Sequence, residues 1–165
     1  MSKGEKMAQV KTNAMRILDK KNINYNIITY ENKDGKIDGL SVAAKIGKSE
    51  DMVYKTLVAQ GVSKELYVFV IPVKEELDLK KASKICGEKK IEMIKVTDIN
   101  KYTGYIRGGC SPIGMKKLYK TFINITVETL ENVIVSGGKI GVQIEISPKN
   151  LIETINAKTE DLIKS

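Results

Sequence analysis

The chain has 165 residues, which is enough for one ordinary domain with a sizeable buried core. It has no histidine and only two cysteines, Cys86 and Cys110, so a Ser-His-Asp or Cys-His hydrolase is excluded and a thiolate zinc site is disfavoured. The 28 lysines and arginines exceed the 20 aspartates and glutamates, and the net charge of +8 favours either a polyanionic partner or a solvated lysine-rich surface.

Neither end nor middle of the chain predicts export or a membrane span. Residues 1–6 lack the apolar core of a signal peptide, and two lone cysteines do not form a disulfide framework. The longest apolar stretch, residues 66–73, is far shorter than the roughly twenty residues that cross a bilayer, so we expect a buried strand there. We therefore expect a cytoplasmic protein with no metal, no cofactor and neither membrane nor DNA as a partner.

Capping residues and hydrophobic spacing predict the first elements of the chain. Residues 1–11 are predicted to be a flexible tail, ahead of one domain over 12–165. Thr12 is suited to cap a helix because an apolar stripe that includes Ala14 and Leu18 follows it. The same signals then predict a strand over 25–30, a polar loop over 31–39, and a second helix that Ser41 opens and Gly47 closes.

The middle of the chain predicts a hairpin and a third helix. Alternating apolar residues indicate strands over 53–59 and 65–73, joined by a turn over 60–63. Asp78 and Gly87 bound the helix, whose apolar face includes Cys86, so we expect this cysteine to be inert core. A further strand over 91–96 and a short helical turn capped by Thr97 follow.

The last third of the chain begins with an irregular segment. Residues 104–117 hold four glycines and a proline and cannot form regular structure. After them we expect strands over 119–125, 132–135 and 140–146, a turn at Gly137 and Gly138, and a helix from Ser147 to about Ala157. Tight links between strands rule out an all-parallel sheet, so the predicted class is α/β (α+β-like), with a mixed, largely antiparallel, curved sheet or partial barrel flanked by helices.

Two features carry chemistry. Lys55 shares its strand face with the apolar residues Val53 and Leu57, which places an ammonium group either in a cleft or at an open strand end, where it reaches water. Glycines in residues 103–117 allow the backbone to aim N–H groups at an anion or a carbonyl oxygen, although a plain surface loop fits them equally well. Walker and dinucleotide-binding spacings are absent.

Five segments together make the chain resemble the YbaK family, free-standing relatives of the editing domain inserted in bacterial prolyl-tRNA synthetase. The resemblance covers about residues 12–163. The segments are 13–18 with Tyr30, 53–57, 77–82, 103–117 and 135–139, of which the lysine motif, the Gly-Gly-x-Ser-Pro loop and the Ser-Gly-Gly turn are specific in combination.

The resemblance implies the family fold and a deacylase that removes cysteine from proline tRNA. It implies that Lys55 is the essential lysine and that Gly108 and Gly109 belong to the catalytic loop. The substrate-binding positions it implies are Tyr30, Thr56, Arg107, Cys110, Ser111, Pro112, Ser136 and Gly137. Many members carry an acidic residue where this chain has Val142 and Gln143, so no carboxylate role carries over there.

An activated aminoacyl ester needs no protein nucleophile. Backbone N–H groups and a cation can stabilise the oxyanion, and the thiol of a bound cysteine can attack its own ester, releasing a thiolactone. Cys110 is therefore expected to be part of the pocket wall. Two alternatives stay open: editing of another mischarged tRNA, such as Ala-tRNA(Pro), and a non-catalytic module that binds tRNA or a synthetase. Prolyl-tRNA synthetase is a possible third member of the tRNA complex.

Overall fold

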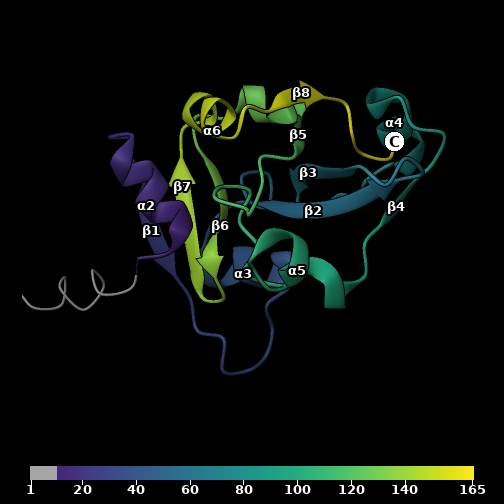
Figure 1. Ribbon diagram of the computed structural model, residues 1–165. Coiled ribbons are helices and arrows are strands. Elements are labelled where there is room, and N and C mark those ends of the chain that lie inside the picture. Colours follow the sequence, from purple (N-terminus) through teal and green to yellow (C-terminus); the bar gives the residue numbers. More distant parts are fainter. Residues whose placement is uncertain (1–10) are drawn as a thin grey trace, which may run out of the picture.

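Two β-sheets form the framework of the computed structural model, which describes residues 11–165 (Figure 1). The antiparallel three-stranded sheet has the order β1 (Asn26–Thr29), β7 (Val142–Ile146), β6 (Val133–Lys139). The five-stranded sheet has the order β4 (Ile91–Met93), β2 (Tyr54–Gly61), β3 (Leu66–Pro72), β5 (Lys120–Asn124), β8 (Lys158–Glu160). Its last two strands join in parallel, whereas β4, β2 and β3 pair antiparallel. The predicted mixed α/β class is therefore confirmed.

A parallel bridge between Val53 and Ile134 connects the two sheets. The Ile134 N–H donates to the Met52 carbonyl at 2.9 Å, and the Val73 N–H donates to the Val53 carbonyl at 2.9 Å. The start of β2 is thus held between β3 on one side and β6 on the other. This arrangement places residues 53–57 where the two sheets meet.

Short helices surround the sheets, and local capping explains where most of them begin. The helices are α2 (Asn13–Lys20), α3 (Gly39–Ile46), α4 (Leu79–Cys86), α5 (Ile99–Thr103) and α6 (Pro148–Ile155), with 3-10 turns η1 (Val96–Asp98) and η2 (Ile125–Thr129). The side chains of Thr12, Asp78 and Ser147 accept backbone N–H groups of the first turn, as predicted. Gly47 and Gly87 end α3 and α4 in the left-handed conformation, also as predicted.

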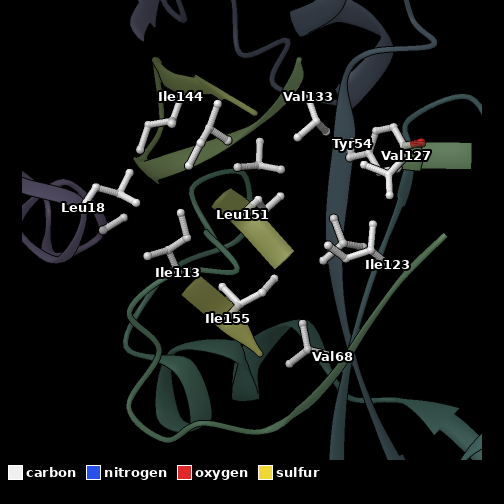
Figure 2. Close-up of a cluster of buried hydrophobic side chains, with 14 of the residues drawn as sticks. Leu18, Tyr54, Val68, Ile113, Ile123, Val127, Val133, Ile144, Leu151 and Ile155 are labelled. Carbon is white, nitrogen blue, oxygen red and sulfur yellow. The ribbon is translucent and has the colours of Figure 1, made fainter. Parts of the chain in front are cut away.

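The main core lies between the two sheets and is closed by α2 and α6. Figure 2 shows Leu18 of α2, Ile144 of β7 and Leu151 of α6 in one cluster with Tyr54 and Val68. β3 is buried on both faces: Val68 and Val70 enter this core, while Tyr67, Phe69 and Ile71 enter a second cluster beside α4. The apolar stretch 66–73 is thus a buried strand, as predicted, and Cys86 packs against the second cluster.

Three predicted boundaries are wrong for local reasons. Asp38, not Ser41, caps α3, because the Asp38 carboxylate accepts both the N–H and the hydroxyl of Ser41. Gly137 and Gly138 lie within β6 at a shift of register, where Gly138 adopts φ +101°, so they form a bulge and not the turn. The β2–β3 turn spans 62–65, after the Gly61 N–H donates to the Glu65 carbonyl.

The remaining differences concern short elements. The predicted strand over 91–96 ends at Met93, and Thr97 lies inside η1 without capping a helix. β8 was not predicted because it is polar and three residues long, and only its parallel pairing with β5 makes it a strand. The predicted tail lies outside the described residues except for Lys11, which pairs with Asp19.

The segment after β8 links distant parts of the five-stranded sheet. The Leu162 N–H donates to the Asn124 side chain at 2.9 Å, and the Leu162 carbonyl accepts from the Asp78 N–H at 2.8 Å. Residues 161–164 therefore join the end of β5 to the cap of α4. Among residues 11–165, no helix has the length and apolar character needed to cross a membrane.

Candidate active site

A cavity of about 760 Å³ opens where the two sheets meet. Five parts of the chain form its wall: residues 35–42 with the start of α3, residues 53–57 at the start of β2, Val73 after β3, residues 107–110, and the facing residues of β6 and β7. The lining residues are Gly35, Ile37, Asp38, Gly39, Leu40, Val42, Val53, Tyr54, Lys55, Thr56, Leu57, Val73, Arg107, Gly108, Cys110, Ser136 and Gln143.

Lys55 is the second residue of β2 and contributes a half-buried ammonium group to this wall. Burial lowers the pKa of Lys55, and the carboxylates of Glu76 and Glu75 oppose this change only in part. Within residues 11–165, Lys55 takes part in no ion pair. The sequence left two positions open for Lys55, a cleft or an open strand end. The structure combines them, because Lys55 lies near the start of β2 and also lines a cavity.

Gly108 and Cys110 line the same cavity, and their backbone N–H groups are candidate donors. Their N–H groups donate to no other backbone group among residues 11–165. The Gly109 N–H, in contrast, donates to the Ile106 carbonyl at 2.9 Å and is not available to a ligand. Gly108 has φ +85°, and a Cβ atom there would lie 2.6 Å from the Ile37 side chain, so this loop requires glycine at that position.

The structure brings six of the eleven predicted site residues together at the cavity wall. They are Lys55, Thr56, Arg107, Gly108, Cys110 and Ser136. The other five, Tyr30, Gly109, Ser111, Pro112 and Gly137, do not line it.

Four of these five residues have other surroundings in the structure. The Ser111 hydroxyl is fully buried and accepts the Ile113 N–H at 3.2 Å. Pro112 lines a separate cavity of about 160 Å³, and Gly137 packs under the side chain of Val142. The Tyr30 hydroxyl is buried without a hydrogen-bond partner in the described part of the chain. These five residues therefore do not line the cavity, and their roles in catalysis or substrate binding stay predictions.

Cys110 fits the predicted role in the pocket wall. Burial raises the pKa of its thiol to about 11, against a smaller opposing effect from the Thr103 hydroxyl. A protonated thiol is a weak nucleophile, so the protein offers no activated cysteine in this cavity. Burial likewise raises the pKa of Cys86 to about 12, in agreement with its expected inert role.

Residues 35–42 are the part of the wall that sequence reasoning missed. Their first part belongs to the polar stretch over 31–39, which predicts only a loop and which Figure 1 shows in blue below β6 and α3. Lys45 of α3 holds this loop: its ammonium group donates to the carbonyls of Glu31 and Lys36 at 2.8 and 2.9 Å. It also pairs with Asp34 at 2.8 Å.

Two uncharged polar side chains at the wall lack hydrogen-bond partners among residues 11–165. The Thr56 hydroxyl is buried and unpaired, and the Gln143 amide, on a residue only 5 % exposed, forms no hydrogen bond. Such groups are costly unless a ligand or water satisfies them. Among the same residues, no three His, Cys, Asp or Glu side chains form a group that could hold a metal ion.

The arrangement suits a carbonyl compound that carries further polar groups. Lys55 and the N–H groups of Gly108 and Cys110 can donate to an oxygen that gains negative charge, while Ser136, Thr56 and Gln143 offer acceptors. The cavity contains no histidine and no activated cysteine, so the wall provides donors and acceptors but no evident protein nucleophile.

Comparison with known proteins adds a family and a set of relatives. The family model for the aminoacyl-tRNA editing domain matches residues 40–154. EbsC of Enterococcus faecalis (strain ATCC 700802 / V583), which carries the provisional name of a Cys-tRNA(Pro)/Cys-tRNA(Cys) deacylase, is 39% identical over 158 residues, 96% of each chain. The uncharacterised protein YwhH of Bacillus subtilis (strain 168) is 25% identical over 111 residues, 67% of this chain and 70% of YwhH.

Solved structures share the fold. One, provisionally titled a trans-editing enzyme for prolyl-tRNA synthetase, matches with a TM-score of 0.82 at 21% identity and covers 94% of this chain and 99% of its own. The hypothetical protein APE2540 matches with a TM-score of 0.84 at 20% identity, over 92% of this chain and 99% of its own. At these identities the likeness establishes the architecture alone.

Proposed function

Because the chain belongs to the aminoacyl-tRNA editing domain family, we propose that it deacylates proline tRNA wrongly charged with cysteine. Membership of the family makes the chain an aminoacyl-tRNA deacylase, and the proposal concerns its substrate and mechanism. The name of its relative EbsC, which joins Cys-tRNA(Pro) with Cys-tRNA(Cys), supports cysteine as the amino acid. Residues 12–165 would act as one editing domain.

The observation that carries this proposal is that Lys55, Gly108 and Cys110 line one cavity, while the N–H groups of Gly108 and Cys110 donate to no other backbone group in the described part of the chain. Attack on an ester creates negative charge on the carbonyl oxygen, and donors that are already in place stabilise that charge without reorganising. Lys55 supplies a full positive charge at a half-buried site, where Coulombic attraction is stronger than in water.

The substrate supplies the nucleophile in this mechanism. The sulfur of the bound cysteine attacks its own carbonyl carbon, a C–S bond forms, and the bond from that carbon to the ribose oxygen breaks. The thiol proton passes to the ribose oxygen, so the products are free tRNA and a cysteine thiolactone, which water then hydrolyses to cysteine. Attack within one bound molecule avoids the entropy loss of bringing two reactants together, worth several kcal/mol.

A panel of charged tRNAs tests the proposal. We expect rapid deacylation of Cys-tRNA(Pro), and a collapse of the rate when serine replaces cysteine, because a hydroxyl is far less ionised than a thiol near neutral pH. Cys-tRNA(Cys) in the panel tests whether the tRNA body matters, and Ala- and Pro-tRNA(Pro) test the alternative amino acids. Equal rates for Ser- and Cys-tRNA(Pro) would overturn the substrate-assisted mechanism, and inactivity toward every member would leave only a non-catalytic tRNA-binding role.

We further propose that tRNA is held mainly through its phosphates. The exposed lysines that flank the loop and the β6–β7 turn support this proposal: Lys116, Lys117, Lys120 and Lys139. Binding should weaken with salt by about 0.7 to 0.9 in log-log slope for each neutralised phosphate. A flat salt response would instead favour delivery of the tRNA by prolyl-tRNA synthetase, which a pull-down with and without tRNA would detect.

A further inference from the structure

Gln143 and Ser136 form one polar side of the cavity. They are direct partners across β6 and β7, and both line the cavity. Gln143 is 5 % exposed, and its amide forms no hydrogen bond within residues 11–165. Because Gln143 lines the cavity, its unpaired amide is available to a ligand there.

The charged side chains of the wall lie outside this polar side, which is neutral. Lys55 and Arg107 are cations, and Asp38 is the one carboxylate among the described lining residues. The Asp38 carboxylate accepts the N–H of Ser41 at 3.1 Å and its hydroxyl at 2.7 Å, so it is engaged in capping α3. The cavity thus contains positive charge together with neutral acceptors on β6 and β7.

An aminoacyl ester has two poles that need opposite partners. Its carbonyl oxygen accepts hydrogen bonds, which Lys55 and the loop N–H groups donate, whereas its α-ammonium group only donates and is repelled by Lys55 and Arg107. The ammonium group must therefore find an acceptor away from those cations. Two acceptors are available: the side-chain amide oxygen of Gln143 and the hydroxyl oxygen of Ser136. The Ser136 hydroxyl already accepts the Gly138 N–H at 3.2 Å.

We propose that Gln143, with Ser136 beside it, binds the α-ammonium group of the aminoacyl moiety and so orients the ester carbonyl toward Lys55. This inference rests on the proposed function, since it assigns one end of that substrate. It makes Gln143 a substrate-binding residue that distinguishes amino acids from other acyl groups, and Gln143 is not among the substrate-binding residues that the family resemblance implies.

Kinetics with paired substrates test the inference. The two substrates are proline tRNA charged with cysteine and the same tRNA charged with 3-mercaptopropionate, which keeps the thiol and lacks the amino group. We expect the wild-type chain to prefer the cysteinyl ester by roughly tenfold or more in kcat/KM, the usual effect of a hydrogen bond to a charged group. Gln143→Leu should bring this ratio close to one, and Gln143→Glu, which keeps an acceptor, should retain it.

A matched control separates this effect from damage to the fold. Gln60→Leu makes the same exchange at the far end of β2, where the Gln60 amide donates to the Lys64 carbonyl, and should leave the ratio at the wild-type value. If Gln143→Leu lowers both rates equally and leaves the ratio unchanged, Gln143 does not recognise the ammonium group and the inference fails.

A binding measurement does not depend on catalysis. The side-chain NH₂ signals of Gln143, identified by their loss in Gln143→Leu, should shift on titration with cysteine methyl ester and not with methyl 3-mercaptopropionate. Deacylation of Cys-tRNA(Pro) without such a shift would overturn the inference alone. A shift without deacylation of any charged tRNA would overturn the proposed function and keep the ammonium site.

Discussion

Gly109 lies directly against the backbone of Ile140, so that a Cβ atom at Gly109 would be 2.9 Å from the Ile140 nitrogen. It would also lie 3.1 Å from the carbonyl carbon of Lys139. Because these neighbours are backbone atoms, they cannot turn aside as a flexible side chain would. The contact fixes the loop that carries Gly108 and Cys110 against the β6–β7 turn.

Gly109→Ala should therefore separate the loop from the turn. We expect a loss of about 1–3 kcal/mol in the free energy of unfolding, the usual range for overpacking, and a fall in kcat/KM for deacylation. Gly87→Ala is the control. Gly87 has φ +69° with open space around it, so alanine there should lower the free energy of unfolding by a similar amount, about 1–2 kcal/mol, through backbone strain alone and without a change in activity. Urea unfolding and kinetics of both variants check this, and equal activity in the two would contradict the role of the contact.

Lys55→Met should reduce deacylation while the protein becomes no less stable. Loss of a comparable transition-state contact lowers the rate roughly 10²- to 10³-fold. Burial lowers the pKa of Lys55 in the folded chain, so the unfolded chain binds the proton more tightly and the charge disfavours folding at neutral pH. Removing the charge should keep or raise the melting temperature, with Lys89→Met at an exposed position as the control.

The same shift sets a pH dependence with a defined sign. The stability of the wild-type chain should rise as pH increases through the lowered pKa of Lys55 toward the ordinary value of 10.5, because the folded chain loses its buried charge first. Over that range kcat/KM should fall, since neutral Lys55 no longer stabilises the oxyanion. An alkaline limb that persists unchanged in Lys55→Met would show that another group titrates.

Cys110 should be slow to alkylate and dispensable for turnover. Burial holds the pKa of its thiol at about 11, so almost all of it is protonated near pH 7.5. In a Cys86→Ala background, modification by iodoacetamide, followed by mass spectrometry, should become appreciable only at strongly alkaline pH. Cys110→Ala should keep substantial deacylation, whereas an acyl group trapped on Cys110 would establish covalent catalysis by this residue.

Lys45→Met should loosen the part of the wall that residues 35–42 provide. The variant leaves the carbonyls of Glu31 and Lys36 without their donor and removes the ion pair with Asp34. We expect faster hydrogen exchange over residues 31–39 and a several-fold rise in KM with kcat nearly unchanged. Lys33→Met, at an exposed position in the same loop, controls for the loss of charge, and unchanged exchange in Lys45→Met would contradict the role of this lysine.

Local signals predicted the elements that local contacts determine. Thr12, Asp78 and Ser147 cap helices with their own side chains, so the cap can be recognised from neighbouring residues alone. Asp38 and Ser41 are both capping types three residues apart, and their mutual hydrogen bond decides between them only in the folded chain. β8 has no local signal, because its strand character comes from pairing with β5.

The candidate site likewise contains parts that the sequence predicted and parts that only the folded chain brings together. Lys55 was recognisable because a lysine among apolar neighbours of a strand needs an explanation, and the glycines of residues 103–117 mark unusual backbone. The part of the wall over 35–42 was not recognisable. Ile37 and Leu40 lie at the cavity only because of the way the folded chain runs through and after a polar loop. Ser111 and Pro112 have the residue types of a binding loop, yet the fold turns them inward.

The order of strands β3, β5 and β8 has a kinetic consequence. These neighbours in the sheet come from widely separated parts of the chain, and both of their pairings are parallel, so each requires a long loop to close before any contact compensates for the lost entropy. The β2–β3 hairpin, in contrast, closes locally. Folding should therefore begin at that hairpin and be limited by docking of the distant strands, and the cavity at the junction of the two sheets takes shape only once those late contacts have formed.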